Sequence, residues 1–273
     1  MTQHSISALT SASQAREGND PIFRLNSEAK ARAAAGESIL DATMGALMDD
    51  EGRIAVMPSV AEAIARVPTG KAAGYSPISG SPPFLDAVRR DLLGNSDLLP
   101  KSVAVTTPGG SGAIYQAIKN FVEPGHQALT TDYYWGPYPV IAQHLERDVS
   151  TFGMFSPDLS FDLEAMKRGI RQHIDTQGRL LLILNFPCHN PTGYSLDAGE
   201  WMSIAEVVRA AGEEAPVAVL LDLAYHRFGG ESADLWIDAV PTMLETTTVL
   251  LAWTASKSFC QYGARIGSLV ALH

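Results

Sequence analysis

Short apolar runs alternate along most of the chain with longer segments in which apolar residues recur every three or four positions. The short runs, rich in Val, Ile and Leu, predict strands, and the longer periodic segments predict helices. The predicted strands cover residues 103–106, 128–130, 149–152, 180–185, 217–222, 247–253 and 266–271. The predicted helices between them cover residues 113–121, 138–145, 163–172 and 198–211. This alternation predicts an α/β fold with a mostly parallel, seven-stranded sheet and helices on both faces.

The first part of the chain follows a different pattern. Residues 1–20 are polar with little periodicity and predict an arm, whereas residues 25–35 predict a helix that closes at a glycine. Ser81 stands before two prolines and predicts the start of another helix, which Gly94 ends. At the other end, the sequence stops at residues 270–273, in the middle or at the end of a predicted strand. No covering element follows this strand, which suggests a fragment or a cover supplied from elsewhere.

Composition narrows the class of protein. The chain has 273 residues, of which 46% are hydrophobic and 18% charged, as is usual for a protein with a sizeable core. Its formal net charge of −10 argues against nucleic acids and anionic membranes as partners. No apolar run approaches the length of a membrane span. Two cysteines, Cys188 and Cys260, make no disulfide framework and indicate a reducing compartment, so we expect a cytoplasmic protein.

Lys257 is the first candidate for chemistry. It follows the predicted strand 247–253, stands near the hydroxyls of Thr254 and Ser256, and precedes Arg265 by eight residues. A lysine held at a strand end among hydrogen-bond donors can form an imine with a carbonyl cofactor and then move a proton. Taken alone, such a lysine is more often a solvated loop charge than a catalytic group. In parallel sheets, ligands bind at the carboxyl ends of the strands, where this residue falls.

A glycine-rich segment, residues 108–113, follows the first predicted strand and precedes a helix. Glycines allow the backbone to approach an anion, and a helix N-terminus offers N–H groups and a favourable dipole. Gly110, Ser111 and Gly112 are therefore candidates for binding a phosphate. The segment matches neither the dinucleotide nor the Walker pattern, and a tight strand-to-helix turn would explain it as well.

Two further strands end in polar side chains. Asn190 lies in an Asn-Pro-Thr-Gly turn, which presents its amide to the crevice at the strand ends. Cys188 and His189 beside it have no second ligand pair, so we expect no metal site. Asp222 ends an apolar strand, where a carboxylate is costly unless it is paired, and a cationic ring nitrogen would be a suitable partner. Tyr225 can supply a hydroxyl nearby.

Together these motifs resemble the class I, fold-type I aminotransferases that use pyridoxal 5′-phosphate, in particular the aspartate and aromatic aminotransferases. The resemblance runs from about Asp41 to the end of the chain. It rests on the ordered set Tyr-x-Pro-Ile-x-Gly, Gly-Gly-Ser-Gly-Ala, His-Asn-Pro-Thr-Gly, Asp-Leu-Ala-Tyr and Ser-Lys-Ser-Phe, with the arginine that follows. It implies that residues 51–273 are an incomplete cofactor-binding large domain. Residues 1–50 would be an arm and the start of a small domain.

The resemblance also implies roles for single residues. Lys257 would form the internal aldimine and later move the α-proton of the substrate, and Asp222 would pair with the pyridinium nitrogen. Asn190 and Tyr225 would hydrogen-bond the phenolic oxygen of the cofactor. The residues implied in phosphate binding are Gly110, Ser111, Gly112, Thr254, Ser256 and Arg265.

Trp135 would stack on the cofactor ring and, with Asn190 and Gly45, line the substrate side of the pocket. Tyr75 would reach the phosphate of a neighbouring subunit, which implies a homodimer with shared active sites. The family continues beyond this sequence into the rest of both domains, and that region carries the arginine that clamps the substrate carboxylate. No arginine in this chain matches that role, so the preference among amino acids stays open.

The resulting functional hypothesis is an aminotransferase that exchanges an amino group between an amino acid and a 2-oxo acid by a ping-pong route. The motifs are shared with β-lyases, cyclases and decarboxylases of the same superfamily, which remain alternatives. Two further alternatives are a non-catalytic cofactor-binding module, as in some transcription regulators, and a truncated fragment that binds the cofactor without turnover.

Overall fold

The computed structural model describes residues 8–14, 21–43 and 45–273. The chain divides into two compact units, residues 1–55 and 56–273. The first contains helices α1 (Ser11–Gln14) and α2 (Pro21–Ala34) and an antiparallel bridge between Met48 and Ile54. Most of the predicted arm lies outside the described residues. The assignment of residues 1–50 and 51–273 to a small and a large domain stays a prediction.

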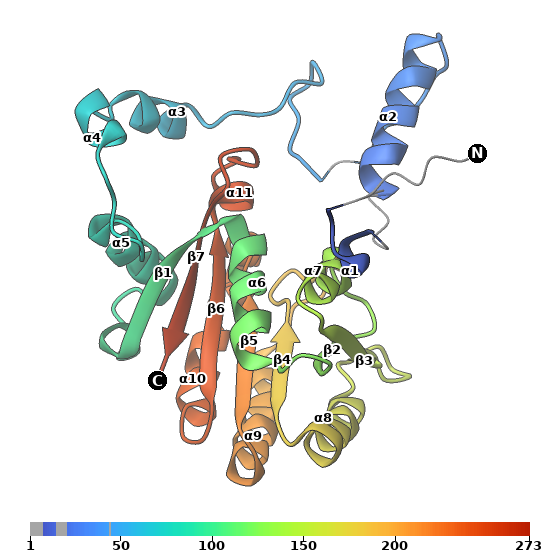
Figure 1. Ribbon diagram of the computed structural model, residues 1–273, viewed down its shortest axis with the longest axis vertical. Helices are drawn as coiled ribbons and strands as arrows, with labels where there is room; N and C mark the ends of the chain where they lie inside the picture. Colours follow the sequence, from blue (N-terminus) through green and yellow to red (C-terminus); the bar gives the residue numbers. More distant parts are fainter. Residues whose placement is uncertain (1–7, 15–20, 44) are drawn as a thin grey trace. The chain divides into compact units, whose positions relative to one another are not determined.

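The second unit is built on one seven-stranded sheet (Figure 1). Its strands are β1 (Ser102–Pro108), β2 (Gln127–Thr131), β3 (Asp148–Phe152), β4 (Leu180–Leu184), β5 (Val217–Asp222), β6 (Thr248–Thr254) and β7 (Ile266–Leu272). The order is β1-β7-β6-β5-β4-β2-β3. Strands β2 to β6 run parallel, and β7 pairs antiparallel with both β1 and β6. The mostly parallel seven-stranded sheet predicted from the sequence is confirmed.

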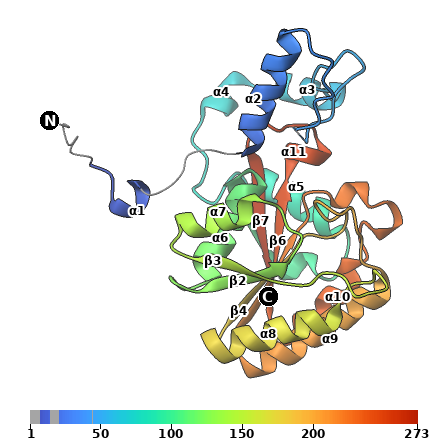
Figure 2. The same cartoon turned by 90° about the vertical axis from the view of Figure 1, so that its right-hand side faces the viewer.

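Helices cover both faces of this sheet, because the side chains of each central strand alternate between two cores. Along β4, Leu180, Leu182 and Leu184 enter one core, while Leu181 and Ile183 enter the other. The first core is covered by α5 (Pro82–Leu93), α8 (Leu163–Gln177), α9 (Ala198–Glu214) and α10 (Trp236–Met243). The second is covered by α6 (Gly109–Phe121) and α7 (Pro137–His144). Figure 2 shows α8, α9 and α10 grouped away from α6 and α7.

Local signals explain where several helices begin and end. Asp197 and Glu200 form a capping box at the start of α9, and Gly178 ends α8 in the left-handed conformation. Helix α10 was not predicted, although Trp236, Ala239, Val240 and Met243 bury one face at helical spacing. Two short helices, α3 (Pro58–Ala65) and α4 (Thr69–Ala73), were also missed. Among the described residues, no helix has the length and apolar character needed to cross a membrane.

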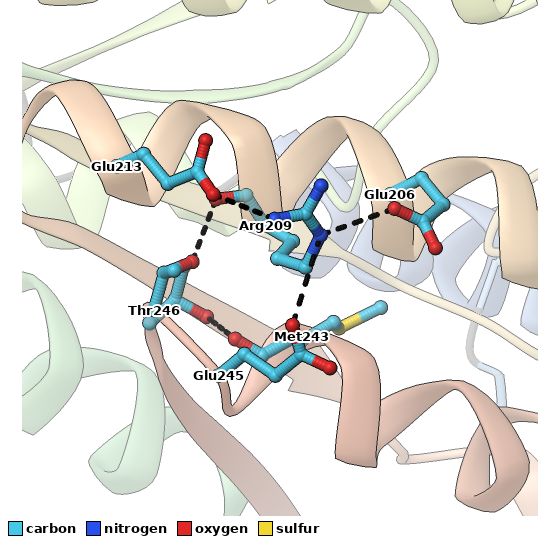
Figure 3. Close-up of polar contacts among 7 residues, drawn as sticks. Glu206, Arg209, Glu213, Met243, Glu245 and Thr246 are labelled. Carbon is cyan, nitrogen blue, oxygen red and sulfur yellow. Dashed lines mark hydrogen bonds and ion pairs between the residues drawn. The ribbon is translucent and has the colours of Figure 1, made fainter.

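Helix α9 is tied to the turn that precedes β6 (Figure 3). The guanidinium of Arg209 bridges to Glu213 at 2.7 Å and Glu206 at 3.1 Å on its own helix, and lies 3.8 Å from Glu245 across the turn. The hydroxyl of Thr246 donates to the backbone oxygen of Arg209 at 2.7 Å. These contacts hold the start of β6 against α9, so the strand that leads to Lys257 is anchored at its far end.

The turn between β1 and α6 passes directly over β7 at Gly267. A Cβ atom on Gly267 would lie 2.3 Å from the carbonyl carbon of Gly109, far inside normal contact. Gly109 itself has φ +71°, a conformation that favours glycine. Because only backbone atoms meet at this crossing, no side chain can move aside. The close approach sets the position of the α6 N-terminus relative to the strand ends.

We predict that Gly267→Ala destabilises the protein by about 1–3 kcal/mol, because the added methyl group must push the β1–α6 turn away. Urea unfolding of the variant and the parent chain measures this difference. Gly263→Ala is the matched control, since a Cβ there meets nothing within 4 Å. Equal destabilisation by both substitutions would contradict the role of the crossing.

Candidate active site

A cavity of about 220 Å³ opens at the carboxyl ends of the parallel strands. Its walls come from the loops after β2, β4, β5 and β6, from the start of α6, and from the loop before β7. The lining residues are Gly110, Ser111, Ile114, Trp135, Asn185, Asn190, Asp222, Ala224, Tyr225, Thr254, Ser256, Lys257, Tyr262 and Arg265. Segments far apart in the sequence therefore meet at the edge of the sheet where parallel α/β folds bind ligands.

Most of the residues singled out in the sequence come together in this cavity, and three do not line it. Gly112 is buried in the first turn of α6, where a Cβ would lie 2.4 Å from the ring of Pro108, so it packs against the turn that precedes the helix. Tyr75 is fully exposed in the segment before α5 and is absent from the lining. Gly45 belongs to the first unit, and its contact with substrate stays a prediction.

Asp222 is the buried carboxylate of the cavity, with 4% of its surface exposed. Its Oδ2 accepts a hydrogen bond of 2.6 Å from the hydroxyl of Tyr138, and its Oδ1 accepts one of 3.3 Å from the backbone N–H of Ala224. Burial raises the pKa of Asp222, while both hydrogen bonds oppose that rise by favouring the ionised form. A cation placed against the carboxylate would offset the cost of burying its charge. The site therefore fits a protonated ring nitrogen.

Sequence reasoning missed two residues that hold this carboxylate and its neighbours. Tyr138 was assigned to a helix without a role, because its contact with Asp222 spans 84 positions of sequence. Asn185 was treated as the end of a strand, yet its amide donates to the backbone oxygen of Asp222 at 2.9 Å and accepts from the N–H of Asn190 at 2.8 Å. Asn185 thus ties the end of β5 to the Asn190 turn. A polar residue ending an otherwise apolar strand was the available signal.

Lys257 lies in the single-turn helix α11 (Ala255–Ser258), directly after β6. Its Nζ lies 5.3 Å from the ring centroids of both Tyr225 and Tyr262. Aromatic faces attract an ammonium group electrostatically, so the two rings hold the side chain over the cavity. The sequence had indicated Tyr225 as a site residue through its hydroxyl, and it had not indicated Tyr262.

The start of α6 brings together groups that could hold an anion. Helix α6 begins there with Gly109 and Gly110, and its first N–H groups have no acceptors within the helix. The guanidinium of Arg265 packs against Gly109, where a Cβ would meet Nη2 at 2.4 Å. The hydroxyls of Thr254 and Ser256 lie 3.0 Å apart beside it. A helix N-terminus, a guanidinium and two hydroxyls together fit a phosphate group.

His189 fastens two loops that border the cavity. Its Nε2 lies 3.2 Å from the hydroxyl of Thr131 at the end of β2, and its Nδ1 lies 2.9 Å from the hydroxyl of Thr192. The ring also packs on Phe186 with centroids 5.1 Å apart. Burial lowers the pKa of His189 to about 4, so the imidazole is neutral at neutral pH. Through these two hydroxyls, its nitrogens link the loops that carry Trp135 and Asn190.

His226, four positions after Asp222, is buried. Its Nδ1 lies 2.7 Å from the backbone oxygen of Leu223, and burial lowers its pKa. Within the described residues, no three His, Cys, Asp or Glu side chains gather as a group of metal ligands. His226 therefore holds the backbone after β5 in place rather than binding a metal.

Comparisons with known proteins agree with this geometry. The family description "Aminotransferase class I and II" matches residues 38–273. The aromatic-amino-acid aminotransferase of Paracoccus denitrificans is 30% identical over 93% of this chain and 63% of its own length. Among solved structures, an aminotransferase from Anaerococcus prevotii has a TM-score of 0.87 and 28% identity, covering 98% of this chain and 67% of that one.

A third relative carries a cofactor. The aromatic-amino-acid aminotransferase from Burkholderia pseudomallei, described as covalently bound to pyridoxal phosphate, has a TM-score of 0.74 and 25% identity. The matched region covers 97% of this chain and 66% of that chain. The present chain thus spans a little under two thirds of the length of the Paracoccus relative.

The neutral state of His189 makes stability depend on pH. Because its pKa is lowered in the folded protein, the unfolded chain binds more protons below about pH 6.5, and stability falls as the pH drops from about 6.5 towards 4. His189 contributes a slope of up to about 1.4 kcal/mol per pH unit. Urea unfolding at several pH values should show a shallower slope for His189→Gln than for the parent chain. An unchanged slope in His189→Gln would refute this assignment.

Proposed function

The chain belongs to the class I and II aminotransferase family, and we propose that it forms the cofactor-binding part of a pyridoxal-phosphate-dependent aminotransferase. The proposed reaction moves an amino group between an amino acid and a 2-oxo acid by a ping-pong route. One observation carries the proposal: a single cavity holds a lysine amine, a buried carboxylate and the N-terminus of helix α6. These three groups match the aldehyde, the ring nitrogen and the phosphate of pyridoxal phosphate, respectively.

Each end of the cofactor has a matching set of side chains. Arg265, the first turn of α6 and the hydroxyls of Thr254 and Ser256 would hold the phosphate. Asp222 would hold the ring nitrogen in its protonated state, because the carboxylate is buried and favours a cationic partner. Pyridoxal phosphate supplies an aldehyde that links to an amine and a conjugated ring that accepts the electron pair left when a proton departs from the neighbouring carbon.

The remaining roles fall to the protein. The Nζ of Lys257 would carry the cofactor and then, once released, take the α-proton of the substrate and return it one carbon away. Tyr225 and Asn190 would hydrogen-bond the phenolic oxygen. Trp135 would cover one face of the ring and limit the access of water.

The local charge balance of the cavity supports anionic ligands. Lys257 and Arg265 contribute two positive charges and Asp222 one negative charge, in a chain whose formal net charge is −10. A local excess of positive charge within an acidic protein concentrates small anions at the site. Amino acids and 2-oxo acids both carry the carboxylate that such a site attracts.

We infer that the complete site needs a second subunit. The Tyr75 side chain is fully exposed and lies outside the cavity wall, so it is accessible to a neighbouring chain. Its phenol would donate a hydrogen bond to the phosphate held in the partner site. This arrangement makes the functional unit a homodimer with shared active sites.

The proposal is tested by locating the cofactor on the protein. We predict a yellow complex of the chain with pyridoxal phosphate, in which borohydride reduction fixes the cofactor to Lys257, as peptide mass mapping would show. Lys257→Ala should lose the fixed label while the anion-binding groups still retain the cofactor by non-covalent contacts. A label on another lysine in the parent chain would overturn the assignment.

Arg265→Ala is the matched contrast for that experiment. It keeps the amine but removes a charged, potentially bidentate phosphate contact, and should weaken cofactor binding by about 10- to 100-fold. The borohydride label should then still appear on Lys257 at saturating cofactor. Equilibrium dialysis gives the affinities of both variants, and unchanged affinity in Arg265→Ala would exclude this arginine from the phosphate site.

The shared site generates a separate prediction for Tyr75→Phe. At protein concentrations where sedimentation shows dimers, this variant should bind the cofactor about tenfold more weakly, because one hydrogen bond to a charged group is lost. Under conditions where the parent chain is monomeric, the substitution should have no effect. Tyr115→Phe, which removes another exposed tyrosine hydroxyl, serves as the control. A monomeric chain at every concentration would contradict the shared site.

A further inference from the structure

Tyr138 stands out among the groups around the cavity because the residues assigned to cofactor and substrate do not include it. It lies in the first turn of α7 and none of its surface is exposed. A buried phenol needs a partner for its hydroxyl, and here that partner is the Oδ2 of Asp222 at 2.6 Å. The hydroxyl donates, since an ionised carboxylate can only accept.

The ring of Tyr138 has a second contact with the site. It meets the ring of Trp135 edge to face, with centroids 5.6 Å apart and an interplanar angle of 82°. On another side it stacks with Tyr134 at 6.5 Å and 19°. One side chain therefore touches both the carboxylate proposed to pair with the ring nitrogen and the indole proposed to cover the ring face.

The hydrogen bond from Tyr138 affects both the ionisation and the orientation of Asp222. The ionisable groups that line the same cavity are Tyr225, Lys257, Tyr262 and Arg265. Burial disfavours the ionised carboxylate, and a short hydrogen bond from a phenol favours it. The bond also leaves the carboxylate a single orientation, because Oδ2 is held from α7 and Oδ1 from the backbone of the following loop.

We propose that Tyr138 is a positioning residue: its hydroxyl keeps Asp222 ionised and aimed into the cavity, and its ring sets the place of Trp135. This inference rests on the proposed function for its meaning, but the hydrogen bond can be tested without the cofactor. Removing the hydroxyl makes the carboxylate more basic. In the loaded protein, the proton shared between Asp222 and the ring nitrogen then moves towards the carboxylate.

The first test is a pH titration of Asp222 in the cofactor-free chain. The ¹³C NMR resonance of labelled aspartate reports the ionisation of the carboxyl group. Asp222→Asn identifies the resonance. Tyr138→Phe keeps the ring and should move the titration upward by about one pH unit or more, as the loss of a hydrogen bond to a charged group requires. Tyr134→Phe removes a hydroxyl from the neighbouring stacked ring and should leave the titration in place. Coincident curves for Tyr138→Phe and the parent chain would overturn the proposal.

A second variant distinguishes the loss of the hydrogen bond from a misfolded Tyr138→Phe chain. Fluorinated tyrosine inserted at position 138 has a more acidic hydroxyl and donates a stronger hydrogen bond, so it should move the Asp222 titration downward. A general loss of structure would not produce shifts of opposite sign in the two variants. Shifts of the same sign would therefore refute a direct hydrogen bond as their cause.

The loaded protein supplies an independent readout. With ¹⁵N-labelled pyridoxal phosphate, the ring-nitrogen resonance reports its protonation, and Tyr138→Phe should move it towards the unprotonated position. An unchanged resonance beside a shifted Asp222 titration would refute the positioning role while leaving the hydrogen bond intact. Failure of the parent chain to bind the cofactor would instead count against the proposed function.

Discussion

The cost of burying one carboxylate organises the centre of this protein. Asp222 ends β5, an interior strand of the sheet, so its charge has little access to water. Tyr138 and the backbone of Ala224 donate to its two oxygens, and Asn185 holds the adjoining peptide group. Each donor comes from a different loop or helix. A buried carboxylate would destabilise the core by itself. Here its hydrogen bonds hold these segments in fixed positions relative to one another.

The parallel strands make this convergence possible. Their carboxyl ends lie at one edge of the sheet, and each loop that leaves this edge brings a different functional group. The loop after β2 brings Trp135, the loop after β4 brings Asn190, and the one after β6 brings Lys257. The antiparallel β7 adds Arg265 from the loop at its start. The cavity consequently mixes aromatic, amide, amine and guanidinium groups that no single segment could carry.

Rigidity at this edge comes from neutral polar contacts as much as from charge. His189 bridges Thr131 and Thr192 while it stays uncharged, and thereby joins the ends of β2 and β4. The Gly267 crossing holds the start of α6 by backbone contact alone. Such fixed positions suit a site in which a ring must be gripped at its nitrogen, its face and its phosphate together, because a loose shell would lose the alignment of all three.

Much of the architecture was readable from the sequence because it rests on local signals. The seven strands were recognised from short apolar runs, and Lys257, Asp222 and Asn190 from their places just after such runs. The glycine-rich turn before a helix also predicted a candidate anion site, because it places backbone N–H groups at a helix N-terminus, although a tight strand-to-helix turn explains the same residues equally well.

Other features were decided only by the folded chain. The antiparallel placement of β7, the roles of Tyr138 and Asn185, and the approach of Tyr262 to Lys257 all depend on which distant segments become neighbours. Gly112 was predicted to contact a phosphate; in the folded chain it packs against Pro108 and does not line the cavity, which the motif did not indicate. A pattern along the chain specifies the periodicity and chemistry of each segment. The pairing of segments is selected by the joint burial of their side chains, which no single segment encodes.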